Sequence, residues 1–206
     1  SSLMRPVPYL RPTYRCPTVS APRHFQADLY LVQWLEHIGV GVDVIGDEDV
    51  HAGGVELLAR YRTVITGSHP EYWTTPMLDA IEEYMDGGGR LMYMGGNGFY
   101  WVTTAADEPG VTVEVRRDEA GNRMWNATSG ELHHQFTGEL GGLWRYRGRG
   151  PHKLVGIGFV AEGWDGCNRP YHRQPDSFLP EAAWAFEGIG PEEIIGDSGL
   201  VMGGAA

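Results

Sequence analysis

The sequence predicts an α/β fold: a parallel sheet of the Rossmann-like or flavodoxin-like kind with helices on both faces. Repeated pairs of a helix and a strand indicate it, because apolar residues at helical spacing are followed by a turn and a short apolar run. The expected helices cover 26–38, 54–59 and a segment near Thr75, and the expected strands cover 42–45, 61–65 and 90–94. Strands that alternate with helices pair in parallel through right-handed crossovers.

The helix at 26–38 is the first element. Its core-facing residues are Leu31, Val32, Leu35 and Ile38, and Gly39 is a natural stop. A second face carries Tyr30, Trp34 and His37 at i, i+4 and i+7. Residues 1–25, which carry several prolines, are expected to form an extended lead-in.

The helix before the strand at 90–94 has start and stop signals. Thr75 is the expected N-cap, with Pro76 at the first helical position. Its core stripe is Leu78, Ile81 and Met85. Three glycines, 87–89, are expected to end it.

The pattern changes after Trp101, where a β-rich insertion is expected at about 105–165 of a single domain that spans 26–206. Val111, Val113 and Val115 alternate with polar residues, as in a half-buried strand. A turn at 117–122, a returning strand at 123–127 and a further strand at 153–161 are expected next. The segment 166–182 has three prolines and is expected to be irregular.

The amino-acid composition limits which partners the protein can bind and indicates its cellular compartment. With 16 Lys and Arg against 27 Asp and Glu, the net charge of −11 argues against nucleic acid and against an anionic membrane. Cys16 and Cys167 could form a disulfide, but the simpler interpretation is two free thiols in a cytoplasmic protein. Because the chain opens without Met and stops just after an apolar run, we expect a fragment of a longer polypeptide.

Two loops, 66–73 and 95–101, carry most of the chemistry. Each follows a predicted strand, so both are expected at the carboxyl edge of the sheet, where ligands bind in open α/β folds. In class I glutamine amidotransferases a cysteine is at the tip of such a turn, but here that position is Asn97. Asn97 could orient a substrate carbonyl or amide, or it could simply bond its own backbone.

Oxygen ligands are the stronger metal candidates, since the adjacent His133 and His134 give only a weak zinc signal. Tyr72 lies in the first loop among His69, Glu71 and Trp73, and the acids nearest the histidine pair are Glu131 and Glu139. Phenolate and carboxylate oxygens suit a small, highly charged ion such as Fe(III). The alternatives are a core tyrosine and a solvated turn glutamate.

Three phrases resemble the large subunit of N,N-dimethylformamidase: residues 67–73 (GSHPEYW), 88–101 (GGRLMYMGGNGFYW) and 137–145 (TGELGGLWR). The resemblance runs from about Ala27 to the last residue. It implies hydrolysis of a small amide, and in the full-length enzyme a small subunit and a homo-oligomer. Relatives of unknown activity carry the same phrases.

The resemblance also implies a mononuclear non-haem Fe(III) held by two tyrosines and a glutamate. Tyr72 matches one tyrosine and Tyr30 the other, with Glu139 as the carboxylate and Glu131 or Glu162 as alternatives. His69, His134, Asn168 and Asn97 are the expected catalytic or substrate-contacting residues. Trp73, Phe99 and Trp101 could form an apolar wall for N-methyl groups or belong to the core.

Two other interpretations stay open. The same sheet architecture occurs in sugar-processing ThuA-like proteins, so the loops could bind a ligand without iron. The chain could also be an interaction domain of a larger assembly.

Overall fold

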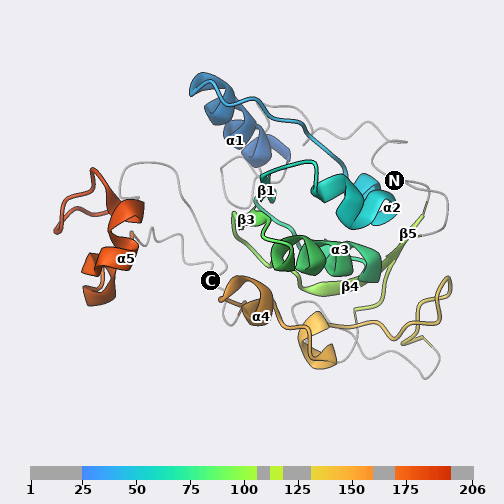
Figure 1. Cartoon of the computed structure of the whole chain (residues 1–206). Coiled ribbons are helices and arrows are strands. Elements are labelled where there is room, and N and C mark those ends of the chain that lie inside the picture. Colours follow the sequence, from blue (N-terminus) through green and yellow to red (C-terminus); the bar gives the residue numbers. More distant parts are fainter. Residues whose placement is uncertain (1–24, 106–111, 118–130, 160–169, 196–206) are drawn as a thin grey trace.

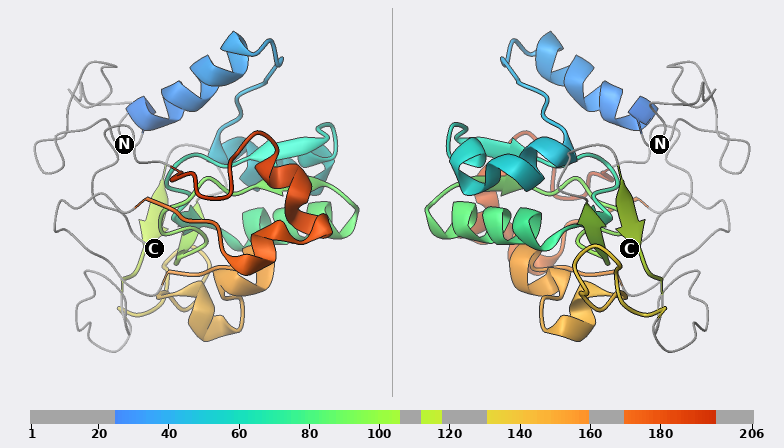
Figure 2. Two further views of the ribbon diagram at one scale, coloured as in Figure 1. Left: turned by 90° about the vertical axis from the view of Figure 1, so that its left-hand side faces the viewer. Right: turned by 90° about the vertical axis from the view of Figure 1, so that its right-hand side faces the viewer.

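The computed structural model describes residues 25–105, 112–117, 131–159 and 170–195 (Figures 1 and 2). Its α-helices are α1 (Phe25–His37), α2 (Asp47–Leu58), α3 (Thr75–Asp86), α4 (Pro151–Val155) and α5 (Pro180–Ala183). Its strands are β1 (Thr63–Ile65), β2 (Tyr72–Trp73), β3 (Arg90–Met92), β4 (Trp101–Ala105) and β5 (Val113–Val115). Short 3-10 helices are η3 (Trp144–Arg147), η4 (Pro175–Phe178) and η5 (Trp184–Phe186).

The described strands form two small sheets. β1 and β3 pair in parallel, and in the second sheet β2 is parallel to β4, which is antiparallel to β5. The parallel pairing expected of the strands near 61–65 and 90–94 is therefore confirmed. The Rossmann-like or flavodoxin-like class, and the single domain over 26–206, stay predictions.

The main core lies between α3 and its neighbours. α3 packs on α2 and contacts β3 and β4, and in Figure 1 it runs along β4. The buried side chains of this core are Leu58, Trp73, Met77, Leu78, Ala80, Ile81, Tyr84, Phe99, Val102 and Trp144. A second, smaller cluster of Tyr100, Trp101 and Leu143 has Tyr72, Val115 and Phe159 packed against it.

The start of α3 differs by one residue from the prediction. Thr74, not Thr75, is the N-cap, and its hydroxyl accepts a hydrogen bond from the Met77 N–H at 3.3 Å. Thr75 is thus the first helical residue. The predicted end is confirmed, because Gly87 caps the helix.

Three further predictions were wrong. The segment 42–45 is not a strand, since Val42 and Val44 are exposed and pair with no described strand. The second helix begins at Asp47 rather than Gly54, which instead breaks its regular geometry at φ 54°. Residues 153–155 lie in α4, because Pro151 starts a short helix that Gly156 ends in a left-handed conformation.

Other predictions have mixed outcomes. The helix at 26–38 is confirmed as α1, and a strand at Val113–Val115 is confirmed as β5. The expected irregular segment contains η4 and α5. Several predictions concern residues outside the described ranges: the extended lead-in as far as residue 24, the strand at 123–127, and the two cysteines, Cys16 and Cys167.

Residues 170–195 form a unit whose hydrogen bonds and ring contacts are internal to it, as far as the described residues go. Tyr171 and Ile195 exchange backbone hydrogen bonds of 2.9 and 3.0 Å. The Arg173 guanidinium lies 4.1 Å from the ring centroid of Phe178 and 4.6 Å from that of Phe186. The unit lies to one side of the sheets in Figure 1. No helix in the described ranges has the length and apolar character that a membrane span requires.

Candidate functional site

The two predicted loops meet at the carboxyl ends of β1 and β3. A Cβ built on Gly96 would lie 2.9 Å from Cε1 of His69 and 2.9 Å from the Ser68 carbonyl oxygen, so the loops are in close contact. The Phe99 N–H donates to the Pro70 carbonyl at 2.9 Å. The expected convergence of the loops at one edge of the sheet is therefore confirmed.

The second loop holds an unusual backbone conformation. Gly95, Gly96, Asn97 and Phe99 all have positive φ, at 113°, 43°, 54° and 54°. For a bulky residue such as Phe99 this is a costly conformation, and it persists because the ring is fully buried in the core. Strain of this kind is concentrated at functional sites.

Asn97 lies at the tip of this turn. Its Oδ1 atom is buried, and no described group donates a hydrogen bond to it. The alternative in which Asn97 bonds its own backbone is not found within the described part of the chain. A buried amide oxygen of this kind can accept a hydrogen bond from a ligand.

Tyr72 belongs to a cluster in which aromatic rings surround a cation. Arg117 donates a short hydrogen bond from Nη2 to the Tyr72 hydroxyl. Its guanidinium carbon lies 5.7 Å from the ring centroid of Tyr72 and 5.4 Å from that of Trp101. The Trp101 indole N–H in turn donates to Oε1 of Glu71 at 3.0 Å. The phenol oxygen of Tyr72 is thus held by a positively charged donor.

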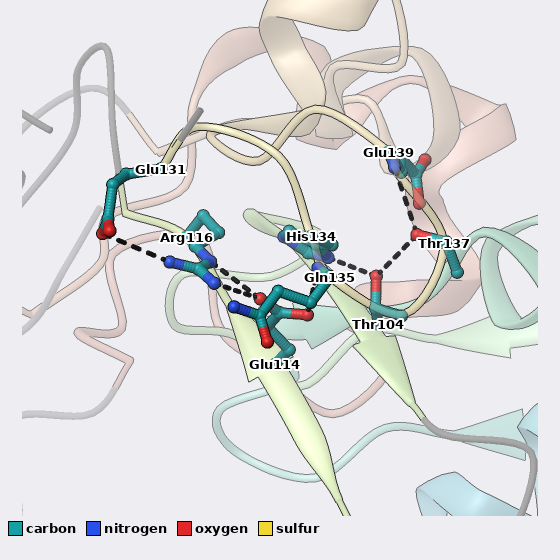
Figure 3. A network of polar contacts seen from close by, with 8 residues as sticks. All are labelled: Thr104, Glu114, Arg116, Glu131, His134, Gln135, Thr137 and Glu139. Carbon is teal, nitrogen blue, oxygen red and sulfur yellow. Dashed lines mark hydrogen bonds and ion pairs between the residues drawn. The ribbon is translucent and has the colours of Figure 1, made fainter. Parts of the chain in front are cut away.

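Glu139 and His134 form a second polar cluster, drawn in Figure 3. Glu139 accepts a 2.8 Å hydrogen bond from the Thr75 hydroxyl, three residues after Tyr72. The backbone N–H of His134 donates to the Glu139 carbonyl at 2.8 Å. The Thr104 hydroxyl contacts Nδ1 of His134 and lies 3.4 Å from that of Thr137.

His134 is only 1% exposed, and its Nε2 has no hydrogen-bond partner among the described residues. Burial lowers the pKa of the imidazole, and Arg116 and Arg147 act in the same direction. Glu114 and Glu139 oppose the shift without reversing it. His134 is therefore neutral near pH 7 and can accept a proton.

The other acid candidates have different surroundings. Glu131 is paired with Arg116 at 3.5 Å and its side chain is 62% exposed. Glu162 and Asn168 lie outside the described residues. The described structure thus brings Glu139, rather than Glu131, to the start of α3.

Tyr30 is placed differently from Tyr72. It is 57% exposed on α1. Asp28, two residues earlier, accepts a 2.6 Å hydrogen bond from the Ser68 N–H, so that side of α1 faces the first loop. Residues two apart on a helix point in nearly opposite directions, so the Tyr30 side chain is turned away from this contact.

The donor atoms near Tyr72 are oxygens of the kind that an iron ion prefers. Across the described residues, no group of three or more His, Cys, Asp and Glu could hold a metal. A metal site made of described residues alone would therefore include tyrosine. Tyr72, with its oxygen beside a guanidinium, and the half-buried Glu139 are hard oxygen donors that fit such an ion.

Sequence reasoning missed Arg117 and Thr104. Arg117 is expected only as the first residue of a turn at 117–122, of which 118–122 lie outside the described residues. It lies two residues after β5 and reaches back to Tyr72 of β2. Thr104 carries no motif, and only its inward position on β4 beside His134 gives it a role. Trp73, Phe99 and Trp101 are at most 8% exposed, which places them in the core and not on an accessible wall.

Comparison with known proteins identifies the family. The profile described as N,N-dimethylformamidase beta subunit-like, C-terminal, matches residues 1–206. The N,N-dimethylformamidase beta subunit of Paracoccus aminophilus is 42% identical over 205 residues, and that of an Alcaligenes species is 43% identical. Each alignment covers the whole chain but only 26% of the relative. The chain therefore belongs to the family of N,N-dimethylformamidase beta subunit-like C-terminal regions.

Proposed function

We propose that this chain is the core of a metal-dependent hydrolase of small N-substituted amides, with N,N-dimethylformamide, which would give formate and dimethylamine, as the model substrate. The observation that carries the proposal is the family match over every residue. Because the chain spans about a quarter of the length of its curated relatives, the activity is proposed for the protein that contains it.

In this proposal Tyr30, Tyr72 and Glu139 would hold a mononuclear non-haem Fe(III). When bound, the ion supplies Lewis acidity, which polarises the amide carbonyl and makes water more acidic. Three anionic oxygens balance a trivalent cation. Tyr72 and Glu139 are supported by their surroundings, whereas Tyr30 would have to reach the site from the far side of α1.

The proposed proton acceptor is Nε2 of His134. If the Nδ1–H of His134 donates to the Thr104 hydroxyl, the lone pair is left on Nε2, where it can take a proton from the attacking water. The neutral state that burial imposes on His134 suits this role. His69 would return a proton to the departing amine, because it lies against the turn at Gly96.

The proposed substrate contacts are at the turn. Asn97 would orient the amide, since its side-chain oxygen is buried without a donor from the described chain. Asn168 is a further proposed contact. The relatives are named as beta subunits, so we place the chain in an assembly with a small subunit and further copies of itself, in the cytoplasm.

The experiment is metal analysis and visible absorption of the protein loaded with iron, followed by Tyr72→Phe. A ferric-phenolate band is expected in the wild type, and both colour and amide hydrolysis are expected to be lost in Tyr72→Phe. The ring of Tyr72 packs against the smaller core cluster, so Phe keeps the fold. Hydrolysis retained by Tyr72→Phe, or a metal-free wild type that binds a sugar, would contradict the proposal.

A further inference from the structure

Arg117 is half-buried, and its charge has no carboxylate partner among the described residues. The arginine beside it, Arg116, has two such partners: Glu114 at 2.6 Å and Glu131 at 3.5 Å. The contacts of Arg117 are instead the Tyr72 hydroxyl and the rings of Tyr72 and Trp101. A cation withdrawn from water needs a negative group nearby. Among the described residues, the one hydrogen bond of Arg117 goes to the oxygen of Tyr72, so the guanidinium is directed at that oxygen.

The geometry is that of a built contact. Both ring centroids lie within the distance of about 6 Å at which a guanidinium is attracted to an aromatic face. Trp101 is itself fixed by its hydrogen bond to Glu71 and is 1% exposed. Because the ring that supports the guanidinium cannot move, the guanidinium holds the Tyr72 oxygen in one place.

We propose that Arg117 is a positioning residue that orients the Tyr72 phenolate and draws electron density from its oxygen. The inference rests on the proposed function, in which Tyr72 holds iron, and adds to it the group that tunes this ligand. A phenolate oxygen can accept from Arg117 and still have a lone pair for a metal. Partners of metal ligands act in this way in other proteins, and their loss typically costs about 10–100-fold in affinity or activity.

The test compares the visible absorption band of the ferric protein in the wild type, Arg117→Gln and Arg117→Lys. All three are prepared as the full-length, assembled protein. Without the guanidinium the phenolate becomes a better electron donor. The charge-transfer band of Arg117→Gln is therefore expected at longer wavelength, and turnover falls by about 10–100-fold through kcat. Arg117→Lys, which keeps the charge but not the planar fork, should show a smaller shift in the same direction.

Arg116→Gln is the matched control, because it removes the same type of side chain from the adjacent position. Its band is expected at the wild-type wavelength. A purely structural role of Arg117 would change stability but not the band of folded, iron-loaded protein. If Arg117→Gln does not fold, the Arg117→Lys spectrum decides alone.

The outcomes separate the two proposals. An unmoved band in iron-loaded Arg117→Gln, or in Arg117→Lys where that variant decides alone, overturns this inference and leaves the proposed function standing. A wild-type protein with no ferric-phenolate band overturns both. A band that moves equally in Arg116→Gln also counts against Arg117, since the shift would then reflect the general field of the strand.

Discussion

Asn97 and Phe99 show how single residues can define the shape of the candidate site. Both have φ of 54°. Among residues other than glycine, asparagine is one of those most often found in this left-handed conformation. Phenylalanine lacks this preference, but the Phe99 ring fills the core beside Trp73, with the two ring centroids 4.5 Å apart. The conformation of the turn is therefore stabilised by the packing of Phe99 and permitted by the glycines that precede Asn97.

Asn97→Val tests this conformation. A β-branched side chain at positive φ is expected to lower the free energy of unfolding by about 1–3 kcal/mol, measured by urea denaturation. Asn97→Gly, the control, should stay within about 1 kcal/mol of the wild type, because glycine adopts this φ freely. Equal stability of the two variants would contradict a strained turn.

At the scale of elements, α3 is important because its first turn lies between the core and the candidate site. The hydroxyl of Thr74 caps the helix and contacts Nδ1 of His51 at 2.8 Å. The hydroxyl of the next residue, Thr75, points to Glu139 instead. Adjacent threonines thus have separate tasks, one in stability and one at the site.

Substituting the two threonines separates these tasks. Thr74→Ala is expected to cost about 1–2 kcal/mol of unfolding free energy, because the helix loses its cap. Thr75→Ala should cost less, about 0.5 kcal/mol, because the loss of the hydrogen bond to Glu139 is partly offset by the better helix propensity of alanine. In the proposed enzyme it should also reduce amide hydrolysis by freeing Glu139. Thermal or urea denaturation measures the first effect and steady-state kinetics the second. The reverse order of stabilities would restore Thr75 as the cap.

Glu114 on strand β5 makes the stability of the fold depend on pH. Burial would raise the pKa of Glu114, but hydrogen bonds from Arg116, Gln135 and Phe136 outweigh it and hold the pKa below its usual value of 4.5. Since the folded state binds this proton more weakly than the unfolded state, the stabilisation is present above about pH 4.5. It is lost as the pH falls through the lower folded value.

Glu114→Gln should therefore be less stable than the wild type by about 1–2 kcal/mol at pH 7, and the difference should shrink toward pH 3. Urea unfolding at a series of pH values measures it. Glu131→Gln is the control and should change stability by less than about 0.5 kcal/mol, because this exposed acid contacts Arg116 at 3.5 Å only. A difference for Glu114→Gln that is constant with pH would refute the assignment.

For the whole molecule, the main division lies between the sheets with α2 and α3 and the unit at 170–195. The unit is closed by the Tyr171–Ile195 bridge and centred on Arg173, which donates to the Ile189 carbonyl at 2.9 Å and to the Ser177 carbonyl at 3.0 Å. Since its hydrogen bonds are internal, within the described ranges, it can open without unfolding the core.

Arg173→Leu tests this independence by hydrogen exchange. Losing the bonds of a charged donor costs about 2 kcal/mol, so amide exchange within 171–195 is expected to accelerate roughly 30-fold. Exchange in α3 should not change. Arg173→Lys, which keeps the charge, should show a smaller effect. Faster exchange in α3 as well would mean that the two parts unfold together.

The sequence predicted what depends on local periodicity. It predicted α1, α3 and the parallel pair β1 and β3 because their apolar residues repeat at the spacing of a buried face. It was wrong at 42–45, because an apolar alternation forms a strand only where another strand pairs with it, and no strand of the described ranges pairs with this segment. It was wrong at 153–155, where Pro151 starts a short helix and Gly156 ends it, although Leu154 and Val155 begin the apolar pattern that predicted a strand.

For the site, motifs led to the two loops but not to the residues that hold them. The contact between Arg117 and Tyr72 joins positions 45 residues apart, and no spacing in a single sequence reports it. The pairing of Thr104 with His134, 30 residues apart, is of the same kind. Such partners depend on strand register, which a one-residue shift would change entirely.

The left-handed turn also has a practical consequence for loop grafting between family members. Phe99 is both the last residue of the turn's unusual path and a fully buried part of the core. A donor loop that ends before position 99 would lack the buried residue that fixes the turn. A donor loop that includes position 99 would place a side chain from a different core into this one. Loop exchanges are therefore expected to succeed only when position 73, whose Trp73 ring packs on Phe99, is exchanged together with the loop.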